Sequence, residues 1–177
     1  MILRNHLRAI LLVLPALALA HGTLHERIDN LRAAIAKRPE DAALRCKLAG
    51  VYCEHGDWQL ALAELERAGS LVPGCPEVNL LRGEALLSGQ QPAEAKRSID
   101  QFLAVQPPNA HALRLRARAF AALKDTERSL ADYRASLGLG VLNPDHVLES
   151  MDALLANGHT EEAAGSNPAS PTIEGRP

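Results

Sequence analysis

The sequence predicts an all-α fold made of repeated antiparallel pairs of helices. Hydrophobic residues make up 47% of the 177-residue chain, but aromatic residues make up only 3%, and Ala and Leu dominate. This composition favours closely packed helices over a sheet, which is built mainly from β-branched and aromatic residues. Prolines also recur at a constant interval, at Pro39, Pro73 and Pro107. A period of about 34 residues is typical of stacked helical hairpins.

Four further series of residues keep the same register. They are Ala61, Ala95 and Ser129; Tyr52, Leu86 and Phe120; Leu65, Ile99 and Tyr133; and Ala68, Phe102 and Ser136. The small residues allow one helix of a pair to approach the other closely, and the large ones fill the space that opens further along the hairpin. The prolines end the second helix of each pair because they cannot continue it.

Polar turns divide the chain into helix pairs. Such turns lie at residues 56–57, 89–92 and 124–126. The predicted pairs are 42–55 with 57–71, 76–88 with 92–105, and 110–122 with 126–138.

Incomplete elements are predicted at both ends of this array. Residues 24–38 place Ile28, Leu31 and Ile35 on one face, which predicts an amphipathic helix. It serves as an N-terminal capping helix within residues 21–41. At the other end a fourth pair begins at Pro144 and breaks off by residue 164.

The repeat resembles a known family. The best copy reads Leu48-Ala49-Gly50-Val51-Tyr52, followed by Gly56, Ala61, Leu65, Ala68 and Pro73. Over roughly residues 24–164 this pattern resembles the tetratricopeptide repeat (TPR). The resemblance implies an α-solenoid, a right-handed superhelix with three full helix-turn-helix repeats at 42–75, 76–109 and 110–143. The degenerate N-terminal helix precedes these repeats, and a truncated fourth repeat at 144–164 follows them.

Two positions depart from the family pattern. Val141 stands where the next proline of the series is expected, and Arg45 stands where many relatives carry an aromatic residue. These departures affect individual assignments and not the family.

The first twenty residues have the pattern of a signal peptide. Arg4 and Arg8 make a positive start, residues 9–20 are uncharged and apolar, and Ala18-Leu19-Ala20 gives the small-x-small cleavage pattern. The apolar run is shorter than the roughly twenty residues that span a bilayer. We therefore expect an exported protein, periplasmic or secreted, with no stable membrane anchor after cleavage. The alternative is an uncleaved N-terminal anchor.

Charge argues against nucleic acid as a partner. Removal of residues 1–20 takes away two arginines and changes the formal net charge from −2 to −4. A mildly acidic chain does not attract nucleic acid or anionic lipid broadly, and five aromatic residues are too few for a base-stacking platform. The expected partner is another protein or a peptide segment.

The resemblance implies where that partner binds. In TPR proteins the first helix of each pair lines the concave face. In this sequence the corresponding residues are Cys46, Gly50, Cys53 and Glu54, then Glu77, Leu80, Glu84 and Leu87, then His111, Arg114 and Arg118. Arg114 and Arg118 lie four residues apart, so they share a helix face and can clamp a carboxylate with bidentate hydrogen bonds. The alternative is an ordinary solvated charged surface.

The complete carboxylate clamp of chaperone-binding TPR domains is absent. That clamp needs Lys and Asn in earlier repeats, where this chain has Cys46 and Gly50. Binding of a chaperone tail is therefore not expected.

The three cysteines allow one plausible disulfide. Cys46 and Cys53 are seven residues apart on one helix, about 10 Å along its axis, which is too far for a bond. Cys75 follows the second helix of the same pair, and an antiparallel hairpin returns it near Cys46. We expect Cys46–Cys75 to be the bond in an oxidising compartment, with Cys53 left over. The alternative is that all three are small buried apolar residues.

Neither a metal site nor a catalytic site is predicted. Cleavage after Ala20 leaves His21 as an N-terminal residue with His25 nearby, but a metal site usually needs three or four ligands. Phosphate-binding, nucleophile-elbow, zinc-protease and C-x-x-C motifs do not occur. We expect a non-enzymatic interaction scaffold without cofactors. The alternatives are a structural accessory subunit of an envelope or secretion complex, and a metal or redox carrier that uses His21 or the cysteines.

Residues 165–177 are predicted to be a disordered tail, because they are rich in Pro, Ser and Gly. Residues 165–172 also resemble the translated 3′ end of a transfer-RNA gene, and the alternative is an ordinary flexible tail.

Overall fold

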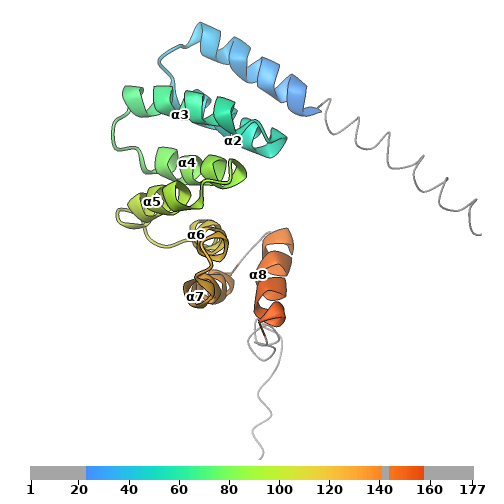
Figure 1. Ribbon diagram of the computed structural model, residues 1–177. Helices are drawn as coiled ribbons and strands as arrows, with labels where there is room; N and C mark the ends of the chain where they lie inside the picture. The colour runs from blue at the N-terminus through green and yellow to red at the C-terminus, as the bar shows by residue number, and fades with distance from the viewer. Residues whose placement is uncertain (1–22, 141–143, 158–177) are drawn as a thin grey trace, which may run out of the picture. The chain divides into compact units, whose positions relative to one another are not determined.

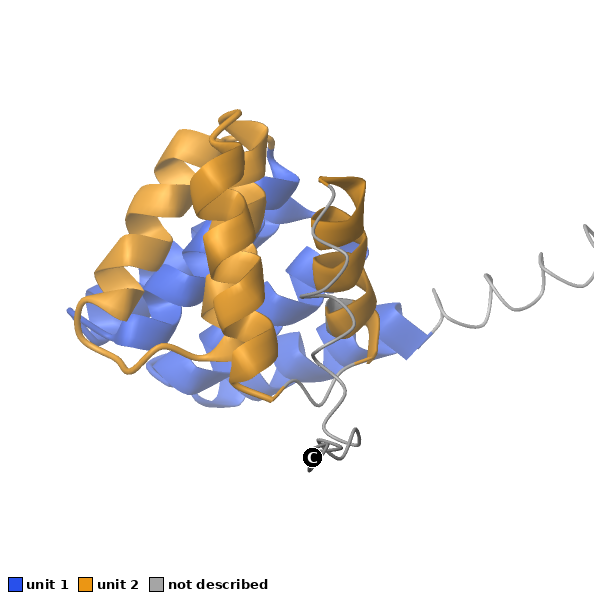
Figure 2. Ribbon diagram, turned by 90° about the horizontal axis from the view of Figure 1, so that it is seen from below, with its two compact units in different colours: residues 1–89 blue, residues 90–177 orange. Residues whose placement is uncertain are grey.

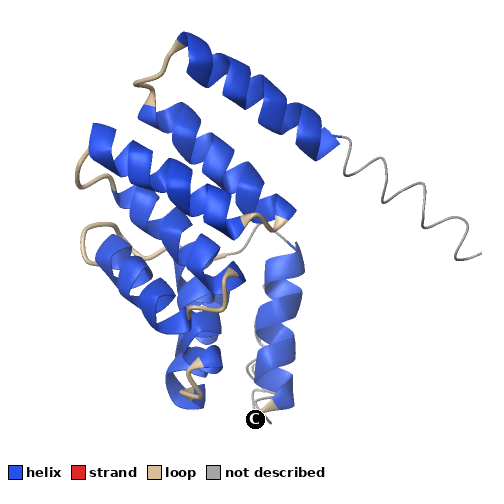
Figure 3. Ribbon diagram, turned by 45° about the horizontal axis from the view of Figure 1, so that its top comes forward, coloured by secondary structure: helices blue, strands red, loops and turns tan. Residues whose placement is uncertain are grey.

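The computed structural model describes residues 23–140 and 144–157, and the regular secondary structure of these residues is α-helical (Figures 1 and 3). The predicted all-α fold of paired helices is therefore confirmed. The predicted signal peptide, His21, Val141 and the tail at 165–177 lie outside the described residues, as do residues 158–164 of the truncated fourth repeat. No helix within the described ranges is long and apolar enough to span a membrane.

The chain divides into two compact units, one ending at Gly89 and the other beginning at Gln90 (Figure 2). This division falls inside the segment 76–109 that was predicted as the second repeat.

Unit 1 contains four helices. A helix over residues 23–37 is followed by α2 (Ala42–His55), α3 (Trp58–Leu71) and α4 (Pro76–Ser88). Helices α2 and α3 pack as a hairpin, and α4 packs against both of them.

Local sequence accounts for the ends of these helices. Asp41 caps α2 by accepting a hydrogen bond from the backbone N–H of Leu44 at 3.0 Å. Gly56 ends α2 with φ +91°, a left-handed conformation that glycine adopts without cost. Pro76 begins α4, because a proline N–H is not needed in the first turn of a helix.

Small residues bring the helices of unit 1 together. Ala49 on α2 and Ala61 and Ala68 on α3 are fully buried. Leu48 and Leu65 fill the core beside them, and Ile28 and Leu31 of the N-terminal helix pack onto the same cluster. The small-and-large alternation of the repeat register is thus the packing pattern of this core.

Unit 2 also contains four helices. They are α5 (Pro92–Leu103), α6 (Ala110–Ala122), α7 (Thr126–Gly138) and α8 (Pro144–Ala156). Helices α6 and α7 form a hairpin, α5 packs on α6, and α8 packs on α7 and α6. The helix predicted at 92–105 ends two residues earlier, at Leu103.

Serines occupy two buried positions of the register in unit 2, and each hydroxyl has a partner. Ser129 Oγ donates to the carbonyl of Ala117 at 2.9 Å, which joins α7 to α6. Ser136 Oγ donates to the carbonyl of Tyr133 at 2.7 Å. Each buried hydroxyl is therefore hydrogen-bonded, and its burial leaves no polar group unpaired.

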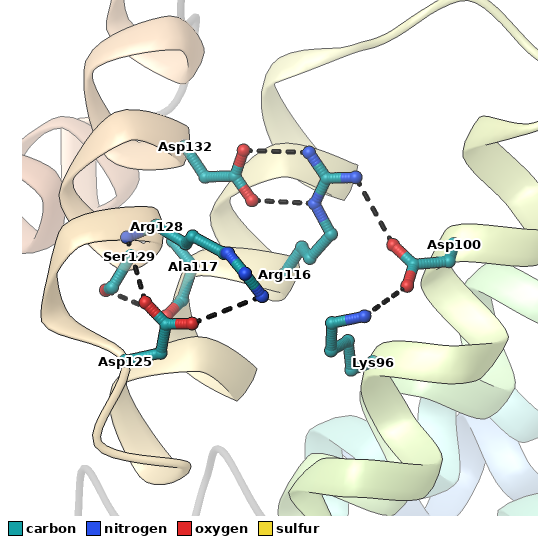
Figure 4. A network of polar contacts seen from close by, with 8 residues as sticks. All are labelled: Lys96, Asp100, Arg116, Ala117, Asp125, Arg128, Ser129 and Asp132. Atoms are coloured by element: carbon teal, nitrogen blue, oxygen red, sulfur yellow. Dashed lines mark hydrogen bonds and ion pairs between the residues drawn. The ribbon is translucent and has the colours of Figure 1, made fainter.

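A polar network ties three helices of unit 2 together (Figure 4). Arg116 on α6 makes a bidentate contact with Asp132 on α7, at 2.7 and 2.8 Å, and reaches Asp100 on α5 at 3.2 Å. Lys96 contacts the other oxygen of Asp100 at 2.6 Å. The hydrogen bond to Asp132 is the largest cause of the raised pKa of Arg116. Because Asp132 is buried, its charge depends on Arg116 for compensation.

The inter-helix turns repeat one backbone conformation. Gly56, Gln90 and Lys124 occupy equivalent positions of the sequence register, and their φ angles are +91°, +56° and +65°. Only the first of them is a glycine, so the other two hold a side chain in a left-handed conformation that normally costs about 1 kcal/mol.

Candidate functional site

A hollow of about 370 Å³ lies in unit 1 between the N-terminal helix and α2. It is lined by Arg27, Asn30 and Leu31 from the first helix and by Lys47, Gly50, Val51 and Glu54 from α2. Two of these residues, Gly50 and Glu54, were predicted to face a partner. We call this feature the Gly50 hollow.

The rim of the Gly50 hollow carries a paired charge. Arg27 Nη1 donates to Glu54 Oε2 at 2.6 Å, and Nη2 donates to Oε1 at 3.2 Å. The hydrogen bond to Glu54, and then its charge, raise the pKa of Arg27. Both side chains are half exposed, so the pair contributes little to stability. Its effect is to hold both charges at the rim, beside the exposed Lys47.

The floor of the Gly50 hollow is apolar and open. Leu31 and Val51 supply the apolar side chains. A Cβ atom built on Gly50 meets only Leu81 Cδ2, at 4.0 Å, which is ordinary van der Waals contact. A side chain at position 50 of the lining would therefore meet no collision at its base.

Cys46 and Cys75 lie near each other in unit 1. Both pack against the same core cluster, and the Cys75 thiol donates to Glu77 Oε2 at 3.1 Å. Burial, and then the neighbouring Cys75 and Glu77, raise the pKa of Cys46. The hydrogen bond from Cys75 lowers the pKa of Glu77. The structure holds all three cysteines as thiols, and the Cys46–Cys75 disulfide stays a prediction.

The remaining predicted residues of unit 1 lie on α2 and α4. Cys53 is partly buried, and burial followed by the charges of Glu84 and Glu54 raises its pKa to about 12. Leu80 and Leu87 on α4 are half-buried. None of these three side chains lines the Gly50 hollow.

Arg114 and Arg118 do converge on a carboxylate, but it belongs to the same chain. Arg114 Nη1 donates to Glu149 Oε2 on α8 at 2.7 Å, and Arg118 Nε lies 3.6 Å from Glu149 Oε1. Tyr133 on α7 donates to that second oxygen at 3.0 Å. Burial and Glu149 raise the pKa of Tyr133, so the phenol stays a donor.

Arg114 is not a solvated surface charge. The residue as a whole is 6% exposed, and Nη2 of Arg114 lies 3.2 Å from Nδ1 of His111. Its buried Nε has no hydrogen-bond partner in the described part of the chain. Only Arg118, at 43% exposure, can reach a ligand while α8 is docked.

The described residues contain no group of three or more His, Cys, Asp and Glu side chains that could hold a metal ion. His25 and His55 meet edge to face, with ring centroids 4.9 Å apart, and His55 Nδ1 lies 2.9 Å from Asp57. His21 lies outside the described residues.

The sequence alone does not point to several residues of these sites. Arg27 and Leu31 were assigned only to a capping helix, and no local spacing links Arg27 to Glu54. Lys47 could have been found, because it lies three and seven residues before Gly50 and Glu54 and so shares their helix face. Glu149 was missed because its role depends on how α8 docks.

Helical hairpins that recur at a constant interval define a helical repeat protein. The tetratricopeptide repeat model matches residues 18–83 and 54–119, which together cover more than half of the chain. The chain therefore belongs to the tetratricopeptide repeat family. No curated protein matches its sequence.

Several solved structures share the fold. MamA (residues 41 to the end) from Desulfovibrio magneticus RS-1 is 18% identical with a TM-score of 0.64, covering 84% of each chain. The TPR protein TTC0263 from Thermus thermophilus is 20% identical with a TM-score of 0.66, covering 77% of this chain and 76% of that one. The first TPR of Spaghetti (RPAP3), bound to the HSP90 peptide SRMEEVD, is 21% identical with a TM-score of 0.57. The match covers 66% of this chain and 92% of that one.

Proposed function

We propose that the chain is a non-enzymatic interaction scaffold that holds a segment of a partner polypeptide in the Gly50 hollow. The observation that carries this proposal is the combination of an apolar floor, at Leu31 and Val51, with charges held at the rim by the Arg27–Glu54 pair. A small apolar side chain of a partner fits the floor, and polar groups beside it meet the rim. Family membership supports the proposal, and one similar TPR structure contains a bound peptide.

Charge favours a partner segment with an acidic residue next to an apolar one. The lining includes two cations, Arg27 and Lys47, and one anion, Glu54. Because Arg27 is already paired with Glu54, Lys47 is the cation that is best placed to meet a carboxylate of the partner.

Site-specific photo-cross-linking in the source cells tests this proposal. A benzophenone side chain placed at Lys47 should give a discrete adduct with another polypeptide. A matched probe at Gln59, an exposed α3 residue outside the hollow, should not give that adduct. Adducts that are absent at position 47, or identical at positions 47 and 59, would contradict binding in this hollow.

We also propose that the chain works outside the cytoplasm. The support is the pattern of residues 1–20, with Arg4 and Arg8 ahead of an uncharged run and a small-x-small site. Mass spectrometry of the protein in envelope and culture fractions should find His21 as the N-terminal residue. A cytoplasmic protein that retains Met1 would contradict export.

A second candidate, a structural subunit of an envelope or secretion complex, is favoured by one observation. Leu148 and Leu155 on α8 are 57% and 46% exposed and lie seven residues apart, so they share one helix face. Exposed apolar stripes of this kind often mark contacts between proteins. If this candidate is correct, replacing both leucines by Ser should release the chain from a large complex in size-exclusion chromatography of cell extracts, and the Gly50 hollow should be unaffected.

A further inference from the structure

A second hollow, also of about 370 Å³, lies in unit 1 on the opposite face of α2. Helix α3 forms part of its wall, together with α2 and the N-terminal helix. On α2 its lining residues are Arg45, Leu48 and Tyr52, which point away from the face that carries Lys47, Gly50 and Glu54. We call it the Glu64 hollow.

The Glu64 hollow has more positive than negative charge in its lining. Arg32, Arg45 and Arg67 line it, and Glu64 is its acidic residue. Both oxygens of Glu64 are already engaged, Oε2 by Arg45 Nη1 at 2.9 Å and Oε1 by Arg67 Nη1 at 2.6 Å. The lining therefore carries an excess of two positive charges.

Arg45 is fixed in the wall and is not the group that meets a ligand. Its Nε and Nη2 donate to the carbonyl of Pro39 at 3.2 and 2.6 Å, and its side chain is only 13% exposed. With Glu64, which is 12% exposed, it forms a buried pair whose charges compensate each other.

Arg32 and Arg67 are the accessible cations. Their side chains are 56% and 63% exposed, and they come from different helices. Arg32 is positioned by Tyr52, because its Nε donates to the phenolic oxygen at 3.1 Å and its guanidinium lies 5.8 Å from the ring centroid. Asp29 lies 3.9 Å from Arg32 but is 76% exposed, so water screens this contact.

Apolar side chains share the lining with these two cations. Ile35, Leu60 and Ala63 line it, and Leu60 is 45% exposed although it is a large hydrophobic residue. Accessible guanidinium groups and apolar side chains in one lining match a ligand that has both an anionic and an apolar part.

We propose that the Glu64 hollow is a second binding site, which takes a carboxylate carried on a small apolar group. Arg32 and Arg67 bind the carboxylate, and the apolar group covers Leu60 and Ala63. Two sources share this chemistry: the C-terminal residue of a polypeptide that ends in an apolar side chain, and a free medium-chain fatty acid. The site is independent of the Gly50 hollow and of its proposed function.

Nuclear magnetic resonance titration of the full chain with acetyl-Ala-Leu tests the site. We expect shifts of the backbone amide signals of Leu60 and Ala63 that saturate with the free-acid dipeptide. The C-terminal amide of the same dipeptide lacks the charge, so it should bind at least about tenfold more weakly. Equal binding of acid and amide, or shifts confined to the Gly50 hollow, would overturn the proposal.

Two kinds of variant make the test specific. Arg32→Gln with Arg67→Gln removes the accessible charges, leaves the Arg45–Glu64 pair intact and should weaken acid binding at least about tenfold. Ala63→Phe keeps all the charges and fills the hollow from an exposed helix position, so it should abolish binding. Gly50→Leu should leave binding unchanged. Circular-dichroism melting curves that match the wild-type curve show that the variants are folded. Full acid binding by the folded Arg32→Gln/Arg67→Gln variant, or by folded Ala63→Phe, would contradict the site.

Octanoate separates the two sources. If acetyl-Ala-Leu binds and octanoate does not, the site takes a polypeptide C-terminus. If octanoate binds and the dipeptide does not, it takes a free fatty acid. Both results support an apolar carboxylate as the ligand, and failure of both probes refutes it.

Discussion

Arg114 on α6 and Glu149 on α8 form a 2.7 Å ion pair in which the arginine side chain is only 7% exposed. Glu149 also accepts a hydrogen bond from the hydroxyl of Tyr133 on α7. One carboxylate on α8 therefore contacts both α6 and α7. The arginine pair that was predicted to clamp a partner's carboxylate is thus engaged by the chain itself. This contact secures α8, the first helix of the incomplete fourth pair.

Glu149→Ala should therefore loosen α8. The change leaves Arg114 buried without its counter-ion, and we expect a local destabilisation of about 1–3 kcal/mol. Amide hydrogen exchange of α8 should speed up roughly tenfold or more, since about 1.4 kcal/mol corresponds to a factor of ten. Glu127→Ala on the exposed face of α7 is the matched control and should change exchange in α8 little. Equal effects of the two variants would show that the pair does not hold α8.

Lys124→Gly should stabilise the protein. Lys124 has φ +65° in the turn between α6 and α7. The equivalent position in the turn between α2 and α3 is Gly56, with φ +91°. Glycine removes the strain of this conformation, and we expect a net gain of about 0.5–1 kcal/mol in the free energy of unfolding, measured with urea. Lys124→Ala keeps the Cβ atom and should give no gain. If alanine stabilises as much as glycine, backbone strain is not the cause.

Gly89→Ala should be destabilising. A Cβ atom on Gly89 would lie 2.8 Å from Cδ2 of Trp58, which is too close for any carbon contact, so the indole must move. We expect a loss of about 1–3 kcal/mol. Because Trp58 is the only tryptophan, its fluorescence should shift as well. Gly69→Ala is the control, since its Cβ meets Val78 at an ordinary 3.7 Å, and it should leave fluorescence unchanged.

Cys53 should be the slowest thiol to react with iodoacetamide. Its pKa of about 12 keeps the thiol protonated at neutral pH, whereas the thiolate is the reactive form. Because the folded protein raises the pKa of Cys53, its free energy of unfolding depends on pH. The stability from the neutral thiol is fully present below the ordinary pKa of 9.0, and it is lost as the pH rises through about 12.

Peptide-resolved mass spectrometry checks the reactivity of Cys53. In urea the three cysteines should react at similar rates, and in the native protein Cys53 should lag behind. Native Cys53 that reacts as fast as the unfolded form would contradict the burial. The same experiment without reductant on exported protein tests the Cys46–Cys75 disulfide, which predicts that these two thiols resist alkylation.

The helical repeats could be predicted because their signals are local and recur. The register that relates Ala61 to Ala95 marks the close approach of paired helices, and Gly56 and Pro76 end and begin helices by backbone chemistry alone. The register predicts that Ser129 is buried, but it does not predict its hydrogen bond. The carbonyl of Ala117, which accepts that hydrogen bond, belongs to another helix.

The sites were harder to predict, because they depend on contacts between helices that are distant in sequence. Arg27 meets Glu54, Arg45 meets Glu64, and Arg114 meets Glu149, and each pair is separated by 19 to 35 residues. A charge pattern places such residues on helix faces, but it does not say which neighbour they meet. Arg114 and Arg118 both lie beside Glu149 of α8, and their spacing on one helix face does not reveal that neighbour.

The effect of Gly50→Leu on the Lys47 adduct decides whether a partner polypeptide occupies the Gly50 hollow. Leucine at this helical position meets no collision at its Cβ and raises helix propensity, so the variant should fold and fill the hollow. We predict that the photo-cross-linked adduct persists with Gly50→Ala and disappears with Gly50→Leu. An adduct of equal intensity in both variants would show that the partner does not occupy the Gly50 hollow.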